Sequence, residues 1–200
     1  MVSDLTKTAG SEPDFGLGLA RRGIGAVAGR AGVDMPDAAQ LLPLLKLGRE
    51  DEGVVVWWVG VHGGAGETTL EEIFRGSRAA GHRWPVAPSG SLPAMVVLVA
   101  RTDARGLRAT QCAMRDWQTR ELNLRLLGLV LMADAPTRPP RAVRDLQRVI
   151  GGGVPRVWSM SWVECWRAGE VPSRANSPRQ AERLLADLRS VGALGGEAGL

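Results

Sequence analysis

A glycine-rich segment, VHGGAGETTL at residues 61–70, holds the residues whose types and spacing could do chemistry. It follows an apolar run, Val54–Val59, that stops at Gly60, and it precedes a stretch with helical patterning. In this order of strand, loop and helix, glycines let several backbone N–H groups point into one concavity, and the helix start adds a partial positive charge. The chemistry that such a loop supports is the binding of a phosphate group or a similar anion, by Gly63, Gly64, Ala65, Gly66, Glu67, Thr68 and Thr69.

The end of this loop resembles the pattern G-x-x-x-x-G-K-[ST] of phosphate-binding loops, with one departure that bears on the chemistry. Gly66 and Thr68 match its last glycine and its Ser/Thr, Val61 stands at its first glycine, and Glu67 stands where the lysine belongs. Two unit charges about 4 Å apart interact by roughly 4 kcal/mol at an effective dielectric constant near 20, so glutamate turns an attraction to phosphate into a repulsion of similar size. Glu67 can instead turn inward to accept the loop's own N–H groups, or pair with arginines of neighbouring loops, namely Arg101, Arg105, Arg138 or Arg141.

The composition describes a basic globular chain of 200 residues, of which 44% are hydrophobic, with a formal net charge of +4 and a pI of about 10.0. Lys7 and Lys46 are the only lysines, so nearly all of the positive charge is arginine. This basic balance leaves a nucleic-acid or other anionic partner open, although the arginines are scattered along the sequence rather than clustered.

No stretch of the sequence predicts membrane insertion or export. The longest apolar runs, Val54–Val59 and Ala94–Ala100, have the length of buried strands. The first residues include acidic side chains and lack the apolar core of a signal peptide. Cys112 and Cys165 lie far apart without metal-binding spacing, so we expect reduced thiols, no structural zinc site and a cytoplasmic protein.

Strand and helix patterns alternate along the chain and predict an α/β fold. Strands are expected at 54–59, 94–100, 126–132 and 154–160, with a short one near 83–86, and helices at 68–80, 102–120, 139–150 and 178–191, with a turn or helix at 162–167. We expect Thr102 to cap the second helix. The alternation is typical of βαβ units and predicts a mostly parallel sheet flanked by helices. The predicted divisions are a flexible or loosely packed arm, this domain and a frayed tail, at 1–50, 51–191 and 192–200.

Parallel strands present their carboxyl ends, where ligands bind, at one edge of the sheet. Asp103 and Asp134 each follow a strand end, where a carboxylate can contact a metal or ligand, or can serve as a helix cap or turn residue. Trp158, Trp162 and Trp166 recur every four residues, a spacing that suits stacking on a ligand base or closure of a core edge. Four loops are expected to meet at this edge, at residues 60–68, 101–105, 133–141 and 159–167.

The loop HGGAGETT resembles the deviant Walker A motif, K-G-G-x-G-K-T-T, of the ParA/MinD class of P-loop ATPases. Further along, AMVVLVARTDARGLRA and LRLLGLVLMADA look like later strands of that class, and VPRVWSMSWVE looks like its last strand and base-side loop. SPRQAERLLADL is similar to its C-terminal helix. The resemblance covers about residues 54–191 and implies a P-loop NTPase-like fold with a degenerate Walker A. The chain also resembles an actinobacterial family of unknown activity with a G-G-A-G-E loop.

Several positions depart from the class that the chain resembles. His62 and Glu67 stand at its two lysine positions, while Thr68, at the Mg²⁺ position, is retained. No strand ending in a Walker B aspartate is expected between the first helix and Ala94. Ala133 and Asp134 stand where that class carries a base-contacting asparagine. Phosphoryl transfer would thus lack both the lysine clamp and a metal ligand.

These departures predict a pseudo-ATPase: a P-loop-like protein that does not hydrolyse nucleotide, needs no resident cofactor, and works as an accessory or regulatory partner through protein contacts. The resemblance also implies a homodimer across the nucleotide face, where His62 replaces the lysine that reaches across. Three alternatives stay open. Mg-ATP or another phosphate ligand could bind through Thr68 and loop arginines, Glu67 could act as a general base beside His62, or the arginine-rich surface could bind DNA.

Overall fold

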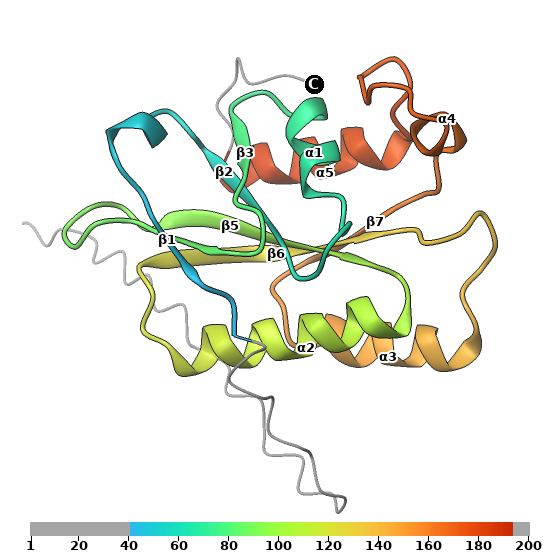
Figure 1. Ribbon diagram of the computed structural model, residues 1–200, viewed down its shortest axis with the longest axis horizontal. Helices are drawn as coiled ribbons and strands as arrows, with labels where there is room; N and C mark the ends of the chain where they lie inside the picture. Colours follow the sequence, from blue (N-terminus) through green and yellow to red (C-terminus); the bar gives the residue numbers. More distant parts are fainter. Residues whose placement is uncertain (1–40, 194–200) are drawn as a thin grey trace, which may run out of the picture. The chain divides into compact units, whose positions relative to one another are not determined.

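A five-stranded sheet forms the centre of the computed structural model, which describes residues 41–193 (Figure 1). Every strand pair in it is parallel, and the strand order is β3-β2-β5-β6-β7. If these five strands are renumbered 1 to 5 along the chain, their order in the sheet is 2-1-3-4-5, which is a doubly wound order. The order in which strands are added to the sheet reverses its direction between β2 and β5. The bounds are β2 (Val56–Gly60), β3 (Ser77–Ala79), β5 (Ala94–Arg101), β6 (Leu124–Met132) and β7 (Val157–Met160).

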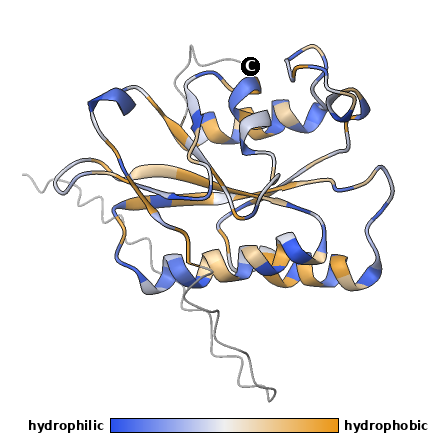
Figure 2. Cartoon of the chain, viewed as in Figure 1, coloured by the Kyte–Doolittle hydropathy of each residue, from blue (hydrophilic) through white to orange (hydrophobic). Residues whose placement is uncertain are grey.

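Helices cover both faces of this sheet, as an all-parallel sheet requires. Two of them, α2 (Ala104–Thr119) and α3 (Arg141–Gly151), lie on one face, and α1 (Glu67–Ile73) and α5 (Arg179–Ser190) lie on the other (Figure 1). A short helix, α4 (Glu164–Arg167), follows β7. The strands are coloured mostly as hydrophobic in Figure 2, in keeping with burial from both sides. These observations confirm the predicted α/β class with a parallel sheet flanked by helices.

Successive residues of β2 point to opposite faces and join two separate cores. Trp57 packs in the core beneath α2 and α3, while Trp58 packs in the core beneath α1 and α5, against Phe74. Ala181, Leu184, Leu185 and Leu188 recur at helical spacing in the sequence, which predicts that they form the inward face of α5. The structure confirms this face, because these four are the buried side chains of α5.

The predicted helix at 68–80 is wrong beyond Ile73. Phe74 is extended, Gly76 has a φ of 78°, and the chain then forms the edge strand β3 beside β2. Ser77 secures this edge, because its hydroxyl accepts the Trp58 indole N–H at 2.7 Å and donates to the Phe74 carbonyl. Ser77-Arg78-Ala79 has no apolar alternation that would indicate a strand, so pairing with β2 outweighs the local helical pattern.

Two further details differ from the prediction. Asp103, and not Thr102, caps α2, because the Asp103 Oδ1 accepts the Gly106 N–H at 2.6 Å. Residues 41–50, which we expected in the N-terminal arm, form β1 (Leu44–Lys46) and the start of the 3-10 helix η2 (Arg49–Asp51). β1 pairs in parallel with β4 (Trp84–Val86), which confirms the short strand expected near 83–86.

The remaining predictions at the chain ends lie mostly outside the described residues. Residues 1–40 of the expected arm and residues 194–200 of the expected tail are not among them, whereas Ala193 is buried in the core beneath α1 and α5. Within residues 41–193, no helix has both the length and the apolar character needed to cross a bilayer.

A buried carboxylate joins β4 to α2. Asp116 is only 2% exposed, and its Oδ2 accepts the Trp84 indole N–H at 2.8 Å. The Arg120 guanidinium lies 3.2 Å from the same carboxylate and also donates to the Leu42 carbonyl. A buried carboxylate is stable only when hydrogen bonds or an ion pair replace its contacts with water, and here Trp84 and Arg120 supply them. Without the carboxylate, the Trp84 N–H and the Arg120 guanidinium would in turn lose their acceptor.

We predict that Asp116→Ala lowers the free energy of unfolding by about 2–4 kcal/mol, because it leaves the Trp84 N–H and the Arg120 guanidinium without their acceptor. Asp145→Ala is the matched control, since Asp145 is half-exposed and should cost under about 1 kcal/mol. Urea unfolding measures both. Equal losses in the two variants would contradict the role given to Asp116.

Candidate functional site

The glycine-rich loop lies where the sheet changes direction. β2 ends at Gly60, residues 61–66 form the loop, and α1 begins at Glu67, which confirms the predicted order of strand, loop and helix. Gly66 caps α1 with a φ of 108°, a conformation that L side chains rarely adopt. The loop therefore sits at the carboxyl edge of β2, beside β5, the position where doubly wound sheets bind ligands.

Glu67 turns inward beneath this loop. Its side chain is buried, with Glu67 only 8% exposed, and its Oε2 accepts the Gly66 N–H at 3.0 Å. The carboxylate lies against the α-carbon of Gly60, because a Cβ added there would come within 2.6 Å of it. Of the two arrangements left open by the sequence, the inward one is observed. The structure records no ion pair within residues 41–193 between Glu67 and the arginines proposed as its partners, Arg101, Arg105, Arg138 and Arg141.

His82 lies beside Glu67, a proximity that the sequence motifs did not predict. Its Nδ1 is 3.8 Å from the Glu67 Oε1 and 2.8 Å from the Gly60 carbonyl oxygen. A carbonyl only accepts hydrogen bonds, so Nδ1 carries a proton and donates it to Gly60. The sequence held one indication that His82 belongs to this site. The chain has only two histidines, and His82 directly follows Gly81, where the segment after α1 ends.

His62 does not pair with Glu67, which corrects the acid–base arrangement considered from the sequence. Its Nε2 accepts the backbone N–H of Arg101 at 3.0 Å, so Nδ1 carries the proton and donates to the Gly63 carbonyl at 2.9 Å. The ring is thus held inside the loop with Nδ1 as its donor and Nε2 as its acceptor. Gly106 of α2 leaves room for it, because a Cβ there would lie 2.7 Å from the His62 Nε2.

Arg101 ties the glycine loop to the next strand. Its Nε donates to the Gly64 carbonyl and its Nη1 to the Ala133 carbonyl, both at 3.0 Å. Burial and the nearby Arg167 guanidinium lower the pKa of Arg101, while Asp134, Asp103 and Glu67 act in the opposite direction. Arginine stays charged at neutral pH in any case, so this side chain is a permanent cation at the loop.

The other predicted loops meet the glycine loop at this edge. The Asp134 N–H donates to the Thr102 hydroxyl at 3.1 Å, and the Ala133 N–H donates to the Met160 carbonyl at 2.9 Å. A cavity of about 230 Å³ lies between two of them, lined among others by Thr102, Asp103, Asp134 and Arg138. Asp103 serves here as the helix cap described above, while Asp134 is exposed.

Thr68 and Thr69 differ in exposure: the Thr68 side chain faces solvent at the first turn of α1, and Thr69 is partly covered. Within the described range, no group of three or more His, Cys, Asp or Glu side chains is arranged to hold a metal ion.

The three C-terminal tryptophans each have a structural contact. The indole N–H groups of Trp158 and Trp166 donate to Asp187 and Asn176, both at 2.9 Å. Trp162 carries the Arg167 guanidinium 5.2 Å above its ring. Trp158 packs in the core beneath α1 and α5, which matches the closure of a core edge.

Cys165 lies on α4 close to this region. Burial, followed by the neighbouring Glu170 carboxylate, raises the pKa of its thiol. The thiol thus stays protonated at neutral pH, which disfavours Cys165 as a nucleophile.

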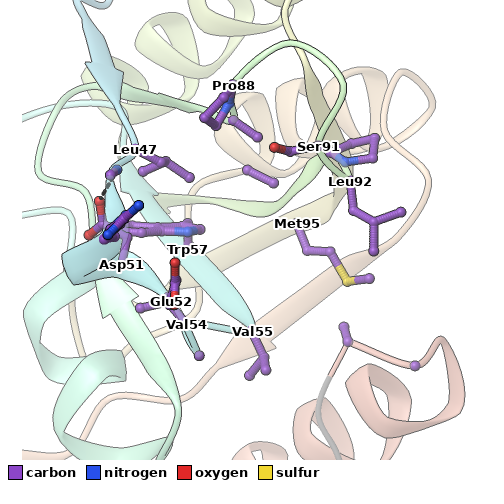
Figure 3. A pocket seen from close by; sticks show the side chains of 18 residues that line it. Leu47, Asp51, Glu52, Val54, Val55, Trp57, Pro88, Ser91, Leu92 and Met95 are labelled. Atoms are coloured by element: carbon purple, nitrogen blue, oxygen red, sulfur yellow. Dashed lines mark hydrogen bonds between the residues drawn. The ribbon is translucent and has the colours of Figure 1, made fainter.

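A larger cavity lies at the opposite, amino edge of the sheet (Figure 3). Its volume is about 720 Å³, and its lining is mainly apolar, with Trp57, Leu92 and Met95 among the contributing side chains. The Asp51 carboxylate accepts the Gly48 N–H at its rim. No sequence motif indicates this cavity, because its walls come from η2, the start of β2 and the segment before β5.

The fold and the site together define an α/β protein with a doubly wound parallel sheet and a glycine-rich loop at the switch point. The chain belongs to the protein family described as a family of unknown function (DUF6668), whose pattern matches residues 54–181. That match includes the glycine loop, α1 to α4 and all five strands of the central sheet. No curated protein matched the sequence.

We predict that Gly60→Ala lowers the free energy of unfolding by about 1–3 kcal/mol, because its new methyl group would meet the Glu67 carboxylate in a well-packed site. Gly63→Ala is the control, since open space surrounds Gly63 and the cost there should stay under about 1 kcal/mol. Urea unfolding compares the two. A Gly60→Ala variant as stable as wild type would show that Glu67 leaves this position freely.

Proposed function

We propose that this protein is a cytoplasmic, non-hydrolysing P-loop-like protein, a pseudo-ATPase that serves as an accessory or regulatory partner through protein contacts. One observation carries the proposal: the Glu67 carboxylate turns under the glycine loop and accepts the Gly66 N–H that a bound phosphate would otherwise use. The loop therefore supplies its own anion.

Electrostatics favours this interpretation. A phosphate charge about 4 Å from Glu67 would be repelled by roughly 4 kcal/mol at an effective dielectric constant near 20. Arg101, a cation that is hydrogen-bonded to the loop, has two of its nitrogens already engaged by backbone carbonyls. No lysine stands in the loop, and β3, which lies beside β2, carries no aspartate for a metal ion. ATP hydrolysis by this class of loop depends on those groups.

Exposed apolar surface supports a role in protein contacts. Leu92 is 89% exposed beside the larger apolar cavity, and Val171 is 71% exposed in the segment after α4. Contiguous apolar surface marks sites of protein contact, whereas single exposed apolar side chains are ordinary, so Leu92 with the apolar lining beside it supports the proposal and Val171 does not. This cavity lies at the amino edge of the sheet, opposite the glycine loop, so contacts made there do not depend on an occupied phosphate site.

We predict that wild-type protein gives no binding heat with Mg-ATP at about 1 mM, while Glu67→Lys binds with a Kd below about 1 mM, because the substitution turns the local repulsion into an attraction. Isothermal titration calorimetry measures both. Glu72→Lys is the matched control, since Glu72 is exposed on the same helix and its substitution makes the same change in net charge.

Three results would count against the proposed pseudo-ATPase or against the role given to Glu67 in it. Wild-type binding of Mg-ATP would favour the nucleotide-binding alternative, and ATP turnover that disappears in Thr68→Ala would rule out a pseudo-ATPase. Binding by Glu72→Lys as strong as by Glu67→Lys would show that net charge alone attracts the ligand. If circular dichroism shows that Glu67→Lys is unfolded, Glu67→Gln removes the charge with little change in shape and should give weak phosphate binding.

A further inference from the structure

One face of the molecule gathers arginines that the sequence scatters. Helix α2 exposes Arg105, Arg108 and Arg115, and helix α3 exposes Arg141 and Arg148, with Arg144 half-buried between them. The two helices pack together on the same side of the sheet (Figure 1). The two sets of arginines are far apart in the sequence, but in the fold they share one surface, which we call the arginine face.

Helical geometry places these side chains on a common side of each helix. At 100° per residue, the three arginines of α2 fall within an arc of about 80°, and those of α3 within about 60°. At a rise of 1.5 Å per residue, the α2 set extends over about 15 Å along the axis, and neighbouring helix axes lie about 8–10 Å apart. The arginine face is thus wide enough to contact several phosphate groups at once.

Acidic residues do little to neutralise the arginine face. Asp116 of α2 is buried and paired with Arg120. Asp145 of α3 is the one exposed carboxylate of these two helices, and it lies between two arginines, 3.8 Å from Arg141 and 2.8 Å from Arg148. Within residues 41–193, the structure records no ion pair for Arg105, Arg108 or Arg115, all of which are exposed.

The opposite helical layer is different. There, α1 and α5 carry both signs, with Glu71, Glu72, Glu182 and Asp187 as well as Arg179, Arg183 and Arg189. The net positive charge of the four helices thus lies on the α2 and α3 side, as is typical of an electrostatic binding surface.

We propose that the arginine face binds the phosphate backbone of double-stranded nucleic acid without reading its sequence. A duplex carries one negative charge per about 1.7 Å of its axis, so several guanidinium groups can pair with phosphates simultaneously. Exposed aromatic rings, on which single strands stack, are not present on α2 or α3, where Trp117 packs partly against the core. This inference goes beyond the proposed function and does not rest on it.

An acidic protein surface is the competing partner, and the composition of the arginine face disfavours it. Protein interfaces centre on a desolvated apolar or aromatic cluster. The exposed large apolar residue on these two helices is Val149, at 70% exposure, which is too little for such a centre. A face made almost wholly of guanidinium groups suits phosphates better.

The test uses the full-length protein and a fluorescein-labelled duplex of random sequence, about 30 base pairs long, titrated by fluorescence anisotropy in NaCl from about 50 to 200 mM. The test variant is Arg108→Gln, Arg115→Gln and Arg141→Gln together. The control variant, Arg75→Gln, Arg179→Gln and Arg183→Gln, removes the same charge from exposed positions of the opposite layer.

We predict that wild type binds the duplex in the micromolar range at about 50 mM NaCl, with affinity that falls steeply with salt. The test variant should bind at least about tenfold more weakly, and the slope of log Kd against log salt should fall by about 0.9 for each phosphate that is no longer neutralised. The control variant should stay within about twofold of wild type.

Three outcomes would overturn the proposal. These are no wild-type binding at the lowest salt concentration, equal losses in both variants, or competition by polyglutamate as strong as that by unlabelled duplex at equal charge, which would assign the face to an acidic protein. If circular dichroism shows a folding defect in the test variant, Arg→Lys changes at the same three positions keep the charge and must retain binding.

Discussion

Burial of the parallel sheet on both faces is the constraint on which the rest of the described structure depends. A parallel strand needs a crossover to its neighbour, and the crossover helices cover the sheet from both sides. Successive residues such as Trp57 and Trp58 must then both be apolar, because each enters a different core. The same arrangement sends every loop after a strand to one edge, where the glycine loop, Arg101 and Asp134 meet.

At that edge, the glycine loop is closed by its own chain. The Glu67 carboxylate accepts the Gly66 N–H from below, His62 accepts the Arg101 N–H from within, and the Arg101 side chain joins Gly64 to Ala133. Each contact satisfies a polar group that would otherwise face a ligand or be left unpaired. The loop is thus held by a carboxylate bonded to its Gly66 N–H and by a guanidinium bonded to its Gly64 carbonyl.

The arginine face and the glycine loop are separate features with separate chemistry. The loop lies at the carboxyl edge between the two helical layers, whereas the arginine face is the solvent side of α2 and α3. Glu67 acts over a few ångströms inside a partly desolvated site, while the arginines act together through solvent and are sensitive to salt. The two proposals made for these features can therefore be tested independently of each other.

The sequence by itself determined the α/β class, the positions of the strongly apolar strands, the inward face of α5 and the departure of Glu67 from the phosphate-loop pattern. Those features follow from local periodicity, glycine placement and residue type, which need no knowledge of neighbours in space. Only the tertiary structure decided that residues 77–79 form a strand and that His82 rather than His62 approaches Glu67. It also decided that arginines scattered in the sequence share one surface. Strand pairing and shared helical faces depend on how the chain is arranged in space and join residues far apart in the sequence, so no local pattern could specify them.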